Sequence, residues 1–294
     1  MSQAPLKILI TGQFGQVSRE LQLRLADLGE LIVLGRDQLD LSQPEGIRQR
    51  VRDLRPDLII NAAAHTAVDQ AETEEDLAFA INARAPGIFA QEAASLDIPL
   101  IHYSTDYVFD GRKDSPYNED DEPNPLGVYG RSKLEGEQAI RAVGGKHLIL
   151  RTSWVYSLHG RNFLLTMQRL LQEKPELRVV ADQIGAPTWA GTIADSTRTI
   201  IEHWRNGDPG AWGTYHLTAK GETSWFGFAQ EIGKHLLAQD KPCSILEPIP
   251  SSAYPTPAAR PLNSRLDCNK LEHEWRVHLP NWRDALIECL APLA

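Results

Sequence analysis

The sequence has few cysteines and no cysteine motif, which excludes two kinds of small stabilised fold. Its 294 residues include three cysteines, Cys243, Cys268 and Cys289, an odd number with no C-x-x-C pair. Neither a disulfide framework nor a zinc site is therefore indicated. Cysteine usage of this kind fits a reducing compartment, so we expect a cytoplasmic protein.

Long apolar runs and excess positive charge are also missing. No stretch approaches the roughly 18 apolar residues of a membrane-spanning helix, and we expect a chain that is not exported. With 30 Lys and Arg against 39 Asp and Glu, the formal charge is −9. This balance disfavours a general nucleic-acid binder or a protein bound to anionic membranes, so neither partner is expected.

The sequence does contain enough apolar material for a large core. Hydrophobic residues make up 42% of the chain and charged residues 23%, which is close to ordinary globular usage. At roughly 150 residues per domain, the length predicts one large domain or two coupled ones.

Short aliphatic runs alternate with longer helical patterns through the first half of the chain. The runs cover residues 7–11, 31–34, 58–61, 99–104 and 147–152. Apolar strands separated by helices are typical of a parallel sheet that is covered on both faces. We therefore predict an α/β fold with a doubly wound, Rossmann-like parallel sheet. Ser42, followed by Pro44 and Glu45, has the pattern of an N-cap at a helix start.

Beyond residue 152 the alternation loosens, and we predict a second, smaller α/β lobe for the substrate. Helical patterns cover residues 162–173, 190–205 and 224–237, with short strands near 178–181 and 213–217. The dinucleotide-binding domain is assigned to residues 1–152 plus part of about 181–217. The substrate domain is assigned to about 153–180 and 218–294.

A glycine turn follows the first predicted strand directly. Gly12 and Gly15 precede a helical pattern over residues 16–28, and Ser18 takes the third small position of a G-x-x-G-x-x-G spacing. Glycines let the backbone approach a pyrophosphate, and free N–H groups at a helix start bind it. The turn predicts a dinucleotide site, with an ordinary strand-to-helix turn as the alternative.

The residues after the second predicted strand bear on the choice of cofactor. This position carries Arg36 and Asp37. A basic residue suits the 2′-phosphate of NADPH, whereas an acid suits the ribose hydroxyl of NADH. Arg36 therefore predicts NADPH, and Asp37 leaves NADH open. A surface salt pair between the two is the structural alternative.

Tyr129 and Lys133 are four residues apart, so they share one face of a helix predicted to run to about Ala142. A phenol with a pKa of about 10 is a poor acid at neutral pH, and a nearby ammonium lowers that pKa. We predict that Tyr129 donates a proton to a substrate carbonyl and that Lys133 also holds the nicotinamide ribose. Thr105, at the end of the fourth strand, is placed to bind the same carbonyl, with an ST-turn as the alternative.

Several motifs resemble those of extended short-chain dehydrogenases. They are Thr11-Gly12-x-x-Gly15, Asn61-Ala62-Ala63-Ala64-His65, the run from His102 to Phe109, and Tyr129-Gly130-x-Ser132-Lys133. More narrowly, residues 151–156, 185–188 and 260–266 resemble the dTDP-4-dehydrorhamnose reductase family, and the likeness covers nearly the whole chain. That family reduces the 4-keto group of dTDP-4-dehydro-L-rhamnose with NADPH or NADH, which forms dTDP-L-rhamnose.

The resemblance implies a set of site residues. Tyr129, Lys133 and Thr105 are the implied catalytic residues. The implied cofactor contacts are Gly15, Gln16, Val17, Asp40, Leu41, Ala63, Ala64, His65 and Tyr103. The implied contacts of the sugar nucleotide are Thr105, Asp106 and Trp154. Trp154 fits a core aromatic equally well, His65 also fits a hydrogen-bonded histidine near a sheet edge, and for His102 we favour that second interpretation.

Two further assignments concern ions. We assign Arg260 and Arg265 to the substrate diphosphate because guanidinium groups pair well with phosphate oxygens; the alternative is a pair of surface cations. Some members of the family dimerise through a magnesium site built from glutamates, and Glu20 matches one contributing position. Residues 188–192 contain no acid, so we expect no metal and leave a homodimer open.

Two other functions stay open besides a reductase that binds a nucleotide sugar. One is a dehydratase, epimerase or reductase acting on another nucleotide sugar. Dehydratases that resemble this chain carry Asp-Glu after the threonine, where this chain has Asp106-Tyr107. The other is a non-catalytic nucleotide-binding subunit, similar to the regulatory subunit of methionine adenosyltransferase, which the same fold permits.

Overall fold

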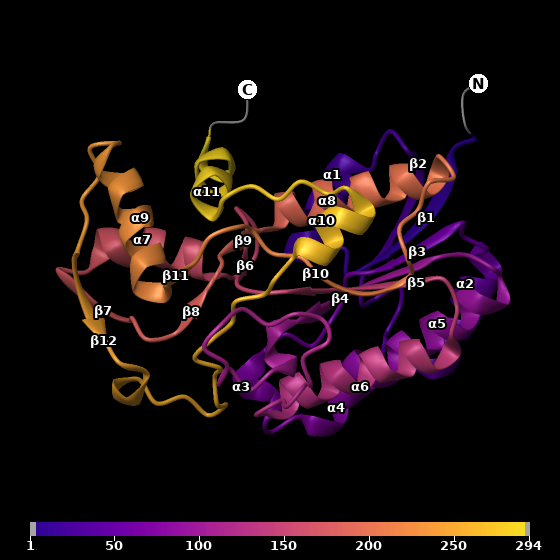
Figure 1. The fold of residues 1–294 in the computed structure, drawn as a ribbon, viewed down its shortest axis with the longest axis horizontal. Coiled ribbons are helices and arrows are strands. Elements are labelled where there is room, and N and C mark those ends of the chain that lie inside the picture. Colours follow the sequence, from indigo (N-terminus) through magenta and orange to yellow (C-terminus); the bar gives the residue numbers. More distant parts are fainter. Residues whose placement is uncertain (1–3, 292–294) are drawn as a thin grey trace.

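A six-stranded parallel sheet lies at the centre of the protein, with helices on both faces (Figure 1). The structure is a computed structural model and describes residues 4–291. In spatial order the strands are β10 (Gly213–His216), β5 (His147–Thr152), β4 (Leu100–Thr105), β3 (Leu58–Asn61), β1 (Leu6–Thr11) and β2 (Gly29–Leu34). The predicted α/β fold with a doubly wound parallel sheet is confirmed.

The predicted strands of the first half match the observed ones to within two residues at each end. The strand predicted near residues 213–217 is β10, which pairs in parallel with β5 as the edge of the same sheet. All four residues of β3 are buried, because helices cover both faces of the sheet there.

Two sets of helices cover the two faces of the sheet (Figure 1). One set is α1 (Gln16–Arg24), α8 (Ala190–Arg205) and α10 (Asn269–Trp275), and the other is α2 (Pro44–Leu54), α5 (Ala85–Ser95) and α6 (Val128–Val143). Alternate side chains of a strand face opposite sides, so Ile8 and Ile10 join one apolar core and Leu9 joins the other.

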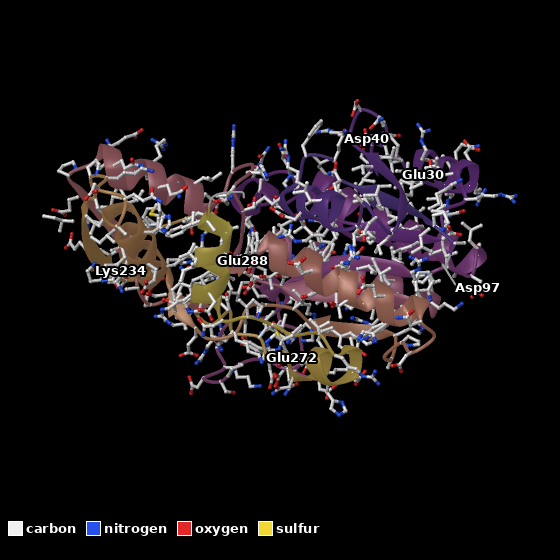
Figure 2. The ribbon with its side chains drawn as sticks, turned by 90° about the horizontal axis from the view of Figure 1, so that it is seen from above. Glu30, Asp40, Asp97, Lys234, Glu272 and Glu288 are labelled. Carbon is white, nitrogen blue, oxygen red and sulfur yellow. The ribbon has the colours of Figure 1, made fainter. Side chains whose placement is uncertain are left out.

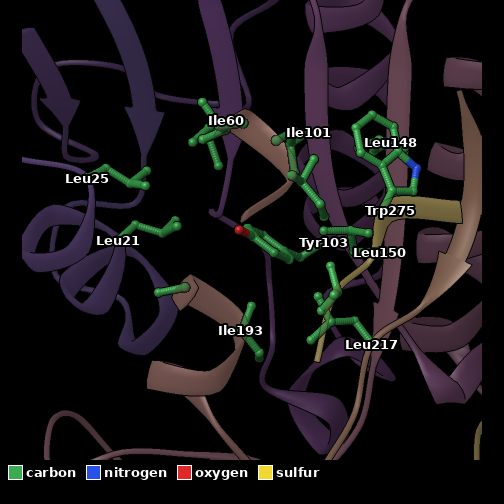
Figure 3. Packing of buried hydrophobic residues seen from close by; sticks show 14 of the residues in the cluster. Leu21, Leu25, Ile60, Ile101, Tyr103, Leu148, Leu150, Ile193, Leu217 and Trp275 are labelled. Carbon is green, nitrogen blue, oxygen red and sulfur yellow. The ribbon is translucent and has the colours of Figure 1, made fainter. Parts of the chain in front are cut away.

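Tyr103 of β4 lies within the first of these cores. Its ring is surrounded by aliphatic side chains, among them Ile60, Leu150 and Ile193 (Figure 3). Its hydroxyl shares a 2.8 Å hydrogen bond with Thr197 Oγ1 of α8. The core therefore anchors the strand whose carboxyl end carries Thr105 and Asp106.

The end of one helix and the start of another differ from the sequence predictions. Helix α1 ends at Arg24 and not at Leu28, because the chain turns there to enter β2. The N-cap of α2 is Gln43 and not Ser42. The amide and hydroxyl of Ser42 both donate to Asp40 Oδ1, at 2.9 and 2.8 Å, so this serine stabilises the preceding turn instead.

The second, smaller lobe lies beyond one end of the sheet (Figure 1). Its helices are α7 (Phe163–Glu173), α9 (Trp225–Leu237) and α11 (Trp282–Leu290). Its short strands pair as β7 (Glu176–Val180) with β12 (Ile245–Ile249), β8 (Ile184–Gly185) with β11 (Thr223–Ser224), and β6 (Val155–Tyr156) with β9 (Thr188–Trp189). A separate apolar cluster around Phe228 and Trp282 fills the lobe. The residue limits assigned to the two domains stay a prediction.

Short helical segments occupy the connections. They are α3 (Val68–Ala71), α4 (Glu75–Phe79), the π-helical turn η1 (Ala80–Arg84) and the 3-10 turns η2 (Asp106–Val108) and η3 (Ser251–Ala253). Charged side chains such as Glu30, Asp97 and Lys234 point outward over both parts of the molecule (Figure 2). Across residues 4–291, no helix combines the length and the apolar character that crossing a membrane requires.

Candidate active site

The glycine turn lies at the carboxyl end of β1 and opens α1. Gly12 has a φ of 81°, and a Cβ at this residue would come within 3.1–3.3 Å of Ala63. The Gly15 amide donates to Gly12 O at 2.7 Å and closes the turn. Gly15 is also the N-cap of α1 and gives it no side-chain cap, so the first amides of the helix stay available to an anion.

A cleft of about 540 Å³ extends from this turn to Tyr129 and Lys133. Ten of the residues expected at the catalytic and cofactor sites line it: Gly12, Gly15, Gln16, Val17, Arg36, Ala63, Ala64, Tyr103, Tyr129 and Lys133. The sequence analysis missed Thr66, Thr152, Val155, Gly160 and Arg161, which line it too. No glycine pattern or acid–base spacing marks these residues in the sequence.

Asp40, Leu41 and His65 do not line this cleft. Leu41 is buried in the core beneath α2, and Asp40 is held by Ser42. The His65 amide donates to Asn82 Oδ1 at 2.8 Å, and its Nε2 lies 3.1 Å from Glu74 Oε2. Contact of these three residues with the cofactor stays a prediction.

Arg36 is exposed on the loop that follows β2. Within the described part of the chain, its guanidinium makes no hydrogen bond or ion pair, so the surface pair with Asp37 is not formed. Its charge does reach Asp40 and Glu74, where it contributes to a lower pKa of each carboxyl group. The cation is therefore available to an anionic ligand at the mouth of the cleft.

Helix α6 carries Tyr129 and Lys133 into the inner end of the cleft. The Tyr129 ring meets the Tyr107 ring edge-on, with centroids 5.4 Å apart. Burial raises the pKa of the Tyr129 phenol, and a hydrogen bond with the Thr105 side chain offsets part of that rise. The phenol is thus protonated at neutral pH.

The expectation that Lys133 lowers the pKa of Tyr129 is wrong for this structure. The Lys133 side chain is turned toward the sheet, where Nζ donates to Tyr103 O at 2.6 Å and lies 3.1 Å from His102 Nε2. Burial lowers the pKa of Lys133 to about 8. The amine can therefore change its charge close to neutral pH.

His102 lies inside the sheet and not near its edge, which corrects the predicted placement. Strand β4 runs between β3 and β5, and His102 is fully buried. Both ring nitrogens have partners, because Nδ1 lies 3.0 Å from Asn61 Nδ2 and Nε2 faces Lys133. The predicted hydrogen bonding is confirmed.

Thr105 and Asp106 form a tight turn beside Tyr129. Thr105 Oγ1 accepts from the Tyr107 amide at 3.1 Å and donates to Asp106 Oδ1 at 3.0 Å, so the ST-turn alternative is also realised. Asp106 Oδ2 is buried and has no hydrogen-bond partner among the described residues. Burial raises the pKa of this carboxyl group to about 6, and hydrogen bonds with the side chains of Ser264 and Thr105 offset part of the rise. A buried acceptor without a partner favours a ligand hydroxyl at this point.

Trp154 packs flat against Trp225, with centroids 3.6 Å apart and 10° between the rings. Its φ is 49°, and a Cβ at Gly185 would come within 2.7 Å of its ring. Both rings are only partly buried, and Trp154 belongs to none of the apolar clusters of residues 4–291, so its contact with the sugar nucleotide stays a prediction.

A second cavity of about 430 Å³ lies between α7, β7 and the 254–260 loop. Aromatic and basic side chains line part of it, namely Phe163, Arg178, Trp225, Tyr254 and Arg260. Arg260 Nη1 donates to the Tyr107 hydroxyl at 3.2 Å, and its Nη2 pairs with Asp69 at 2.9 Å. Through Tyr107, Arg260 connects this cavity to Tyr129.

Arg265 is held differently. Its Nε donates to Asn263 Oδ1 at 2.8 Å, its Nη1 pairs with Glu222 at 3.0 Å and its Nη2 donates to Asp114 O at 2.6 Å. All three guanidinium nitrogens are thus committed within the protein. The structure brings Arg260, but not Arg265, into contact with the tyrosine pair.

Glu20, which matches a magnesium ligand of the family, is paired with an arginine. Glu20 forms a 2.5 Å salt bridge with Arg24, which also pairs with Asp195 at 2.7 Å. Residues 4–291 contain no group of three His, Cys, Asp or Glu side chains that could hold a metal ion.

Comparison with known proteins gives consistent matches over the full length. The family described as RmlD substrate binding domain matches residues 6–294. The dTDP-4-dehydrorhamnose reductase of Burkholderia thailandensis is 46% identical over 295 residues, covering 98% of this chain and 99% of the relative. A dTDP-4-dehydrorhamnose reductase structure from Clostridium acetobutylicum aligns with a TM-score of 0.90 at 38% identity, covering 97% and 98% of the two chains. The Bacillus anthracis enzyme, solved with NADP, aligns with a TM-score of 0.89 at 34% identity, covering 97% and 99%.

Proposed function

The chain belongs to the dTDP-4-dehydrorhamnose reductase family, and on this basis we propose that it reduces the 4-keto group of dTDP-4-dehydro-L-rhamnose to give dTDP-L-rhamnose. The observation that carries the proposal is that Tyr129 and Lys133 both line the cleft that begins at the glycine turn, while the Thr105 side chain hydrogen-bonds with Tyr129. The reductant is a nicotinamide cofactor, for which the cleft has the required parts.

The residues of the cleft fit a dinucleotide. The turn from Gly12 to Gly15 and the uncapped start of α1 would hold the pyrophosphate. Arg36 would pair with a 2′-phosphate, which favours NADPH over NADH. Lys133 would hold the nicotinamide ribose at the inner end. When bound there, the cofactor supplies a hydride to C4 of the sugar.

Tyr129 is the proton donor in this proposal. Burial keeps its phenol protonated, and the protonated form is the one that gives a proton to the carbonyl oxygen. Thr105 donates a hydrogen bond to the same oxygen by turning its hydroxyl away from Asp106.

The sugar nucleotide is proposed to extend from Tyr129 into the second cavity. Asp106 Oδ2 would accept a hydrogen bond from a sugar hydroxyl, since it has no partner in the described protein. Trp154 lies beside this path, because it stacks on Trp225, which lines that cavity. Arg260 would bind the diphosphate, because it lies both at the cavity and at Tyr107. The aromatic wall formed by Phe163 and Trp225 suits a planar base.

The test is the loss of absorbance of NADPH or NADH in the presence of dTDP-4-dehydro-L-rhamnose. Tyr129→Phe is expected to lower kcat by about 10²- to 10⁴-fold while cofactor affinity stays unchanged, because only the transferable proton is removed. Tyr117→Phe is the matched control, since Tyr117 stacks on Phe109 and does not line the cleft.

The outcomes separate the alternatives. Near-normal turnover by Tyr129→Phe contradicts its role as the proton donor. Cofactor binding by the wild type without any turnover contradicts this reductase activity. That result would favour a reductase of another keto sugar or a non-catalytic nucleotide-binding subunit.

A further inference from the structure

A series of buried hydrogen bonds connects the glycine turn with Lys133. The Ala63 amide donates to Thr11 Oγ1 at 3.0 Å, and the Thr11 hydroxyl donates to Asn61 Oδ1 at 2.7 Å. Asn61 Nδ2 lies 3.0 Å from His102 Nδ1, and His102 Nε2 lies 3.1 Å from Lys133 Nζ. All four side chains are buried, so water does not compete with these bonds.

The first bond of this series sets the direction of the others. Thr11 Oγ1 accepts from a backbone amide, and among the described residues Asn61 Oδ1 is the acceptor for its single proton. The amide of Asn61 therefore presents its NH₂ group to His102. A neutral imidazole that accepts at Nδ1 carries its proton at Nε2, and this proton faces Lys133.

The partner of that proton must be an acceptor. An ammonium has only donors, whereas a neutral amine has a lone pair that can accept. The other bond of Lys133 goes to the Tyr103 carbonyl. The nearest carboxylate on α6 is Glu137, which is committed to Arg151 of β5, and β3 carries no charged residue. Burial lowers the pKa of His102, which keeps its ring neutral. Burial also lowers the pKa of Lys133 to about 8, against the opposing charge of Glu137, so the uncharged amine forms just above neutral pH.

We propose that His102, oriented by Thr11 and Asn61, is a positioning residue that favours the uncharged amine of Lys133. The charged state requires the whole series to reverse. The Asn61 amide would turn over so that its NH₂ group donates to Thr11 Oγ1, and the Thr11 hydroxyl would keep its proton but rotate it away from Asn61. The consequence for turnover rests on the proposed function, in which the ammonium of Lys133 binds the nicotinamide ribose. Loss of the Lys133 proton then limits the rate of reduction at alkaline pH, and the hydrogen-bond series connects this titration to the glycine turn.

Asn61→Asp tests the proposal with almost no change in shape. The carboxylate introduced there can only accept, so His102 must donate from Nδ1, and Nε2 becomes an acceptor for an ammonium. Nitrogen NMR of the histidine rings in the intact protein gives the tautomer, and carbon NMR of the Lys133 Cε follows its charge. We expect an Nε2–H tautomer in the wild type, an Nδ1–H tautomer in the variant, and a Lys133 titration raised by about one pH unit.

A second variant and a control accompany this measurement. Thr11→Val removes the hydroxyl that orients Asn61 and is expected to raise the Lys133 titration by a smaller amount. His216→Gln alters another buried histidine of the same sheet, whose Nε2 lies 3.5 Å from Arg151 Nη1. This control is expected to leave the His102 tautomer and the Lys133 titration unchanged.

An Nδ1–H tautomer in the wild type overturns the proposal, as does an unchanged Lys133 titration in both test variants. In the reduction assay, the alkaline limb of kcat/KM is expected to move upward with Asn61→Asp by the shift seen for Lys133. The NMR readouts need no turnover. A shifted titration in a protein that reduces no keto sugar therefore supports the hydrogen-bond series and contradicts only the reductase function.

Discussion

Lys133 and Glu137 are buried residues one turn apart on α6, yet their surroundings are opposite. Burial alone would raise the pKa of Glu137, but Arg151 donates to it at 2.9 and 2.7 Å and Ser104 at 2.6 Å, which hold the pKa below its usual value. Lys133 instead meets an imidazole and a carbonyl. A buried charge with a complete set of partners is costly to break by removing one of them, whereas a buried charge facing neutral groups is suited to a ligand or a reaction.

The largest expected effect comes from breaking the buried ion pair between Glu137 and Arg151. Glu137→Gln leaves the Arg151 guanidinium buried without an anion, so the free energy of unfolding should fall by about 3–5 kcal/mol. Urea unfolding at neutral pH measures the change. Glu202→Gln is the control, because it removes an exposed pair with Arg198 and should change stability by less than about 0.5 kcal/mol. Equal small losses in the two variants would contradict the structural role of Glu137.

Asp106 extends the comparison to a buried carboxylate without a cation. Its raised pKa means that the folded protein binds this proton more tightly than the unfolded chain. The stability contributed by the protonated form is present below about pH 4 and is lost as the pH rises through about 6. Asp106 therefore destabilises the fold at neutral pH, as expected of a group kept for a ligand.

Asp106→Asn should consequently make the protein more stable at neutral pH by about 2 kcal/mol, and the gain should vanish near pH 4. Urea unfolding of both proteins at the two pH values checks this difference. The same variant should lower kcat/KM for the sugar nucleotide, because a charged acceptor is lost. A stability difference that is the same at both pH values would exclude ionisation of Asp106 as its cause.

The sequence was sufficient to predict the sheet and the placement of Tyr129 and Lys133 at one cleft, because strand periodicity and four-residue helical spacing are local signals. The partners of charged groups were not predictable in this way. Glu137 pairs with a residue 14 positions away, and Arg265 with one 43 positions away. The rise in the pKa of Tyr129 also follows from tertiary burial, and Lys133, the helical neighbour that the spacing suggested, is not among the groups that shift it.

The smallest expected effect concerns Arg36. This exposed cation has no partner among the described residues, whereas Arg151 is buried and fully paired. Arg36→Ala should leave the free energy of unfolding unchanged and lower kcat/KM with NADPH about tenfold, while the value with NADH changes little. Arg50→Ala is the control, because Arg50 is an exposed arginine whose Nη2 donates to Gln38 O in the same loop. Parallel rate measurements with both cofactors decide the matter. An unchanged ratio would mean that the lack of an internal partner at Arg36 reflects simple surface exposure, and that a missing partner indicates function only where the charge is buried.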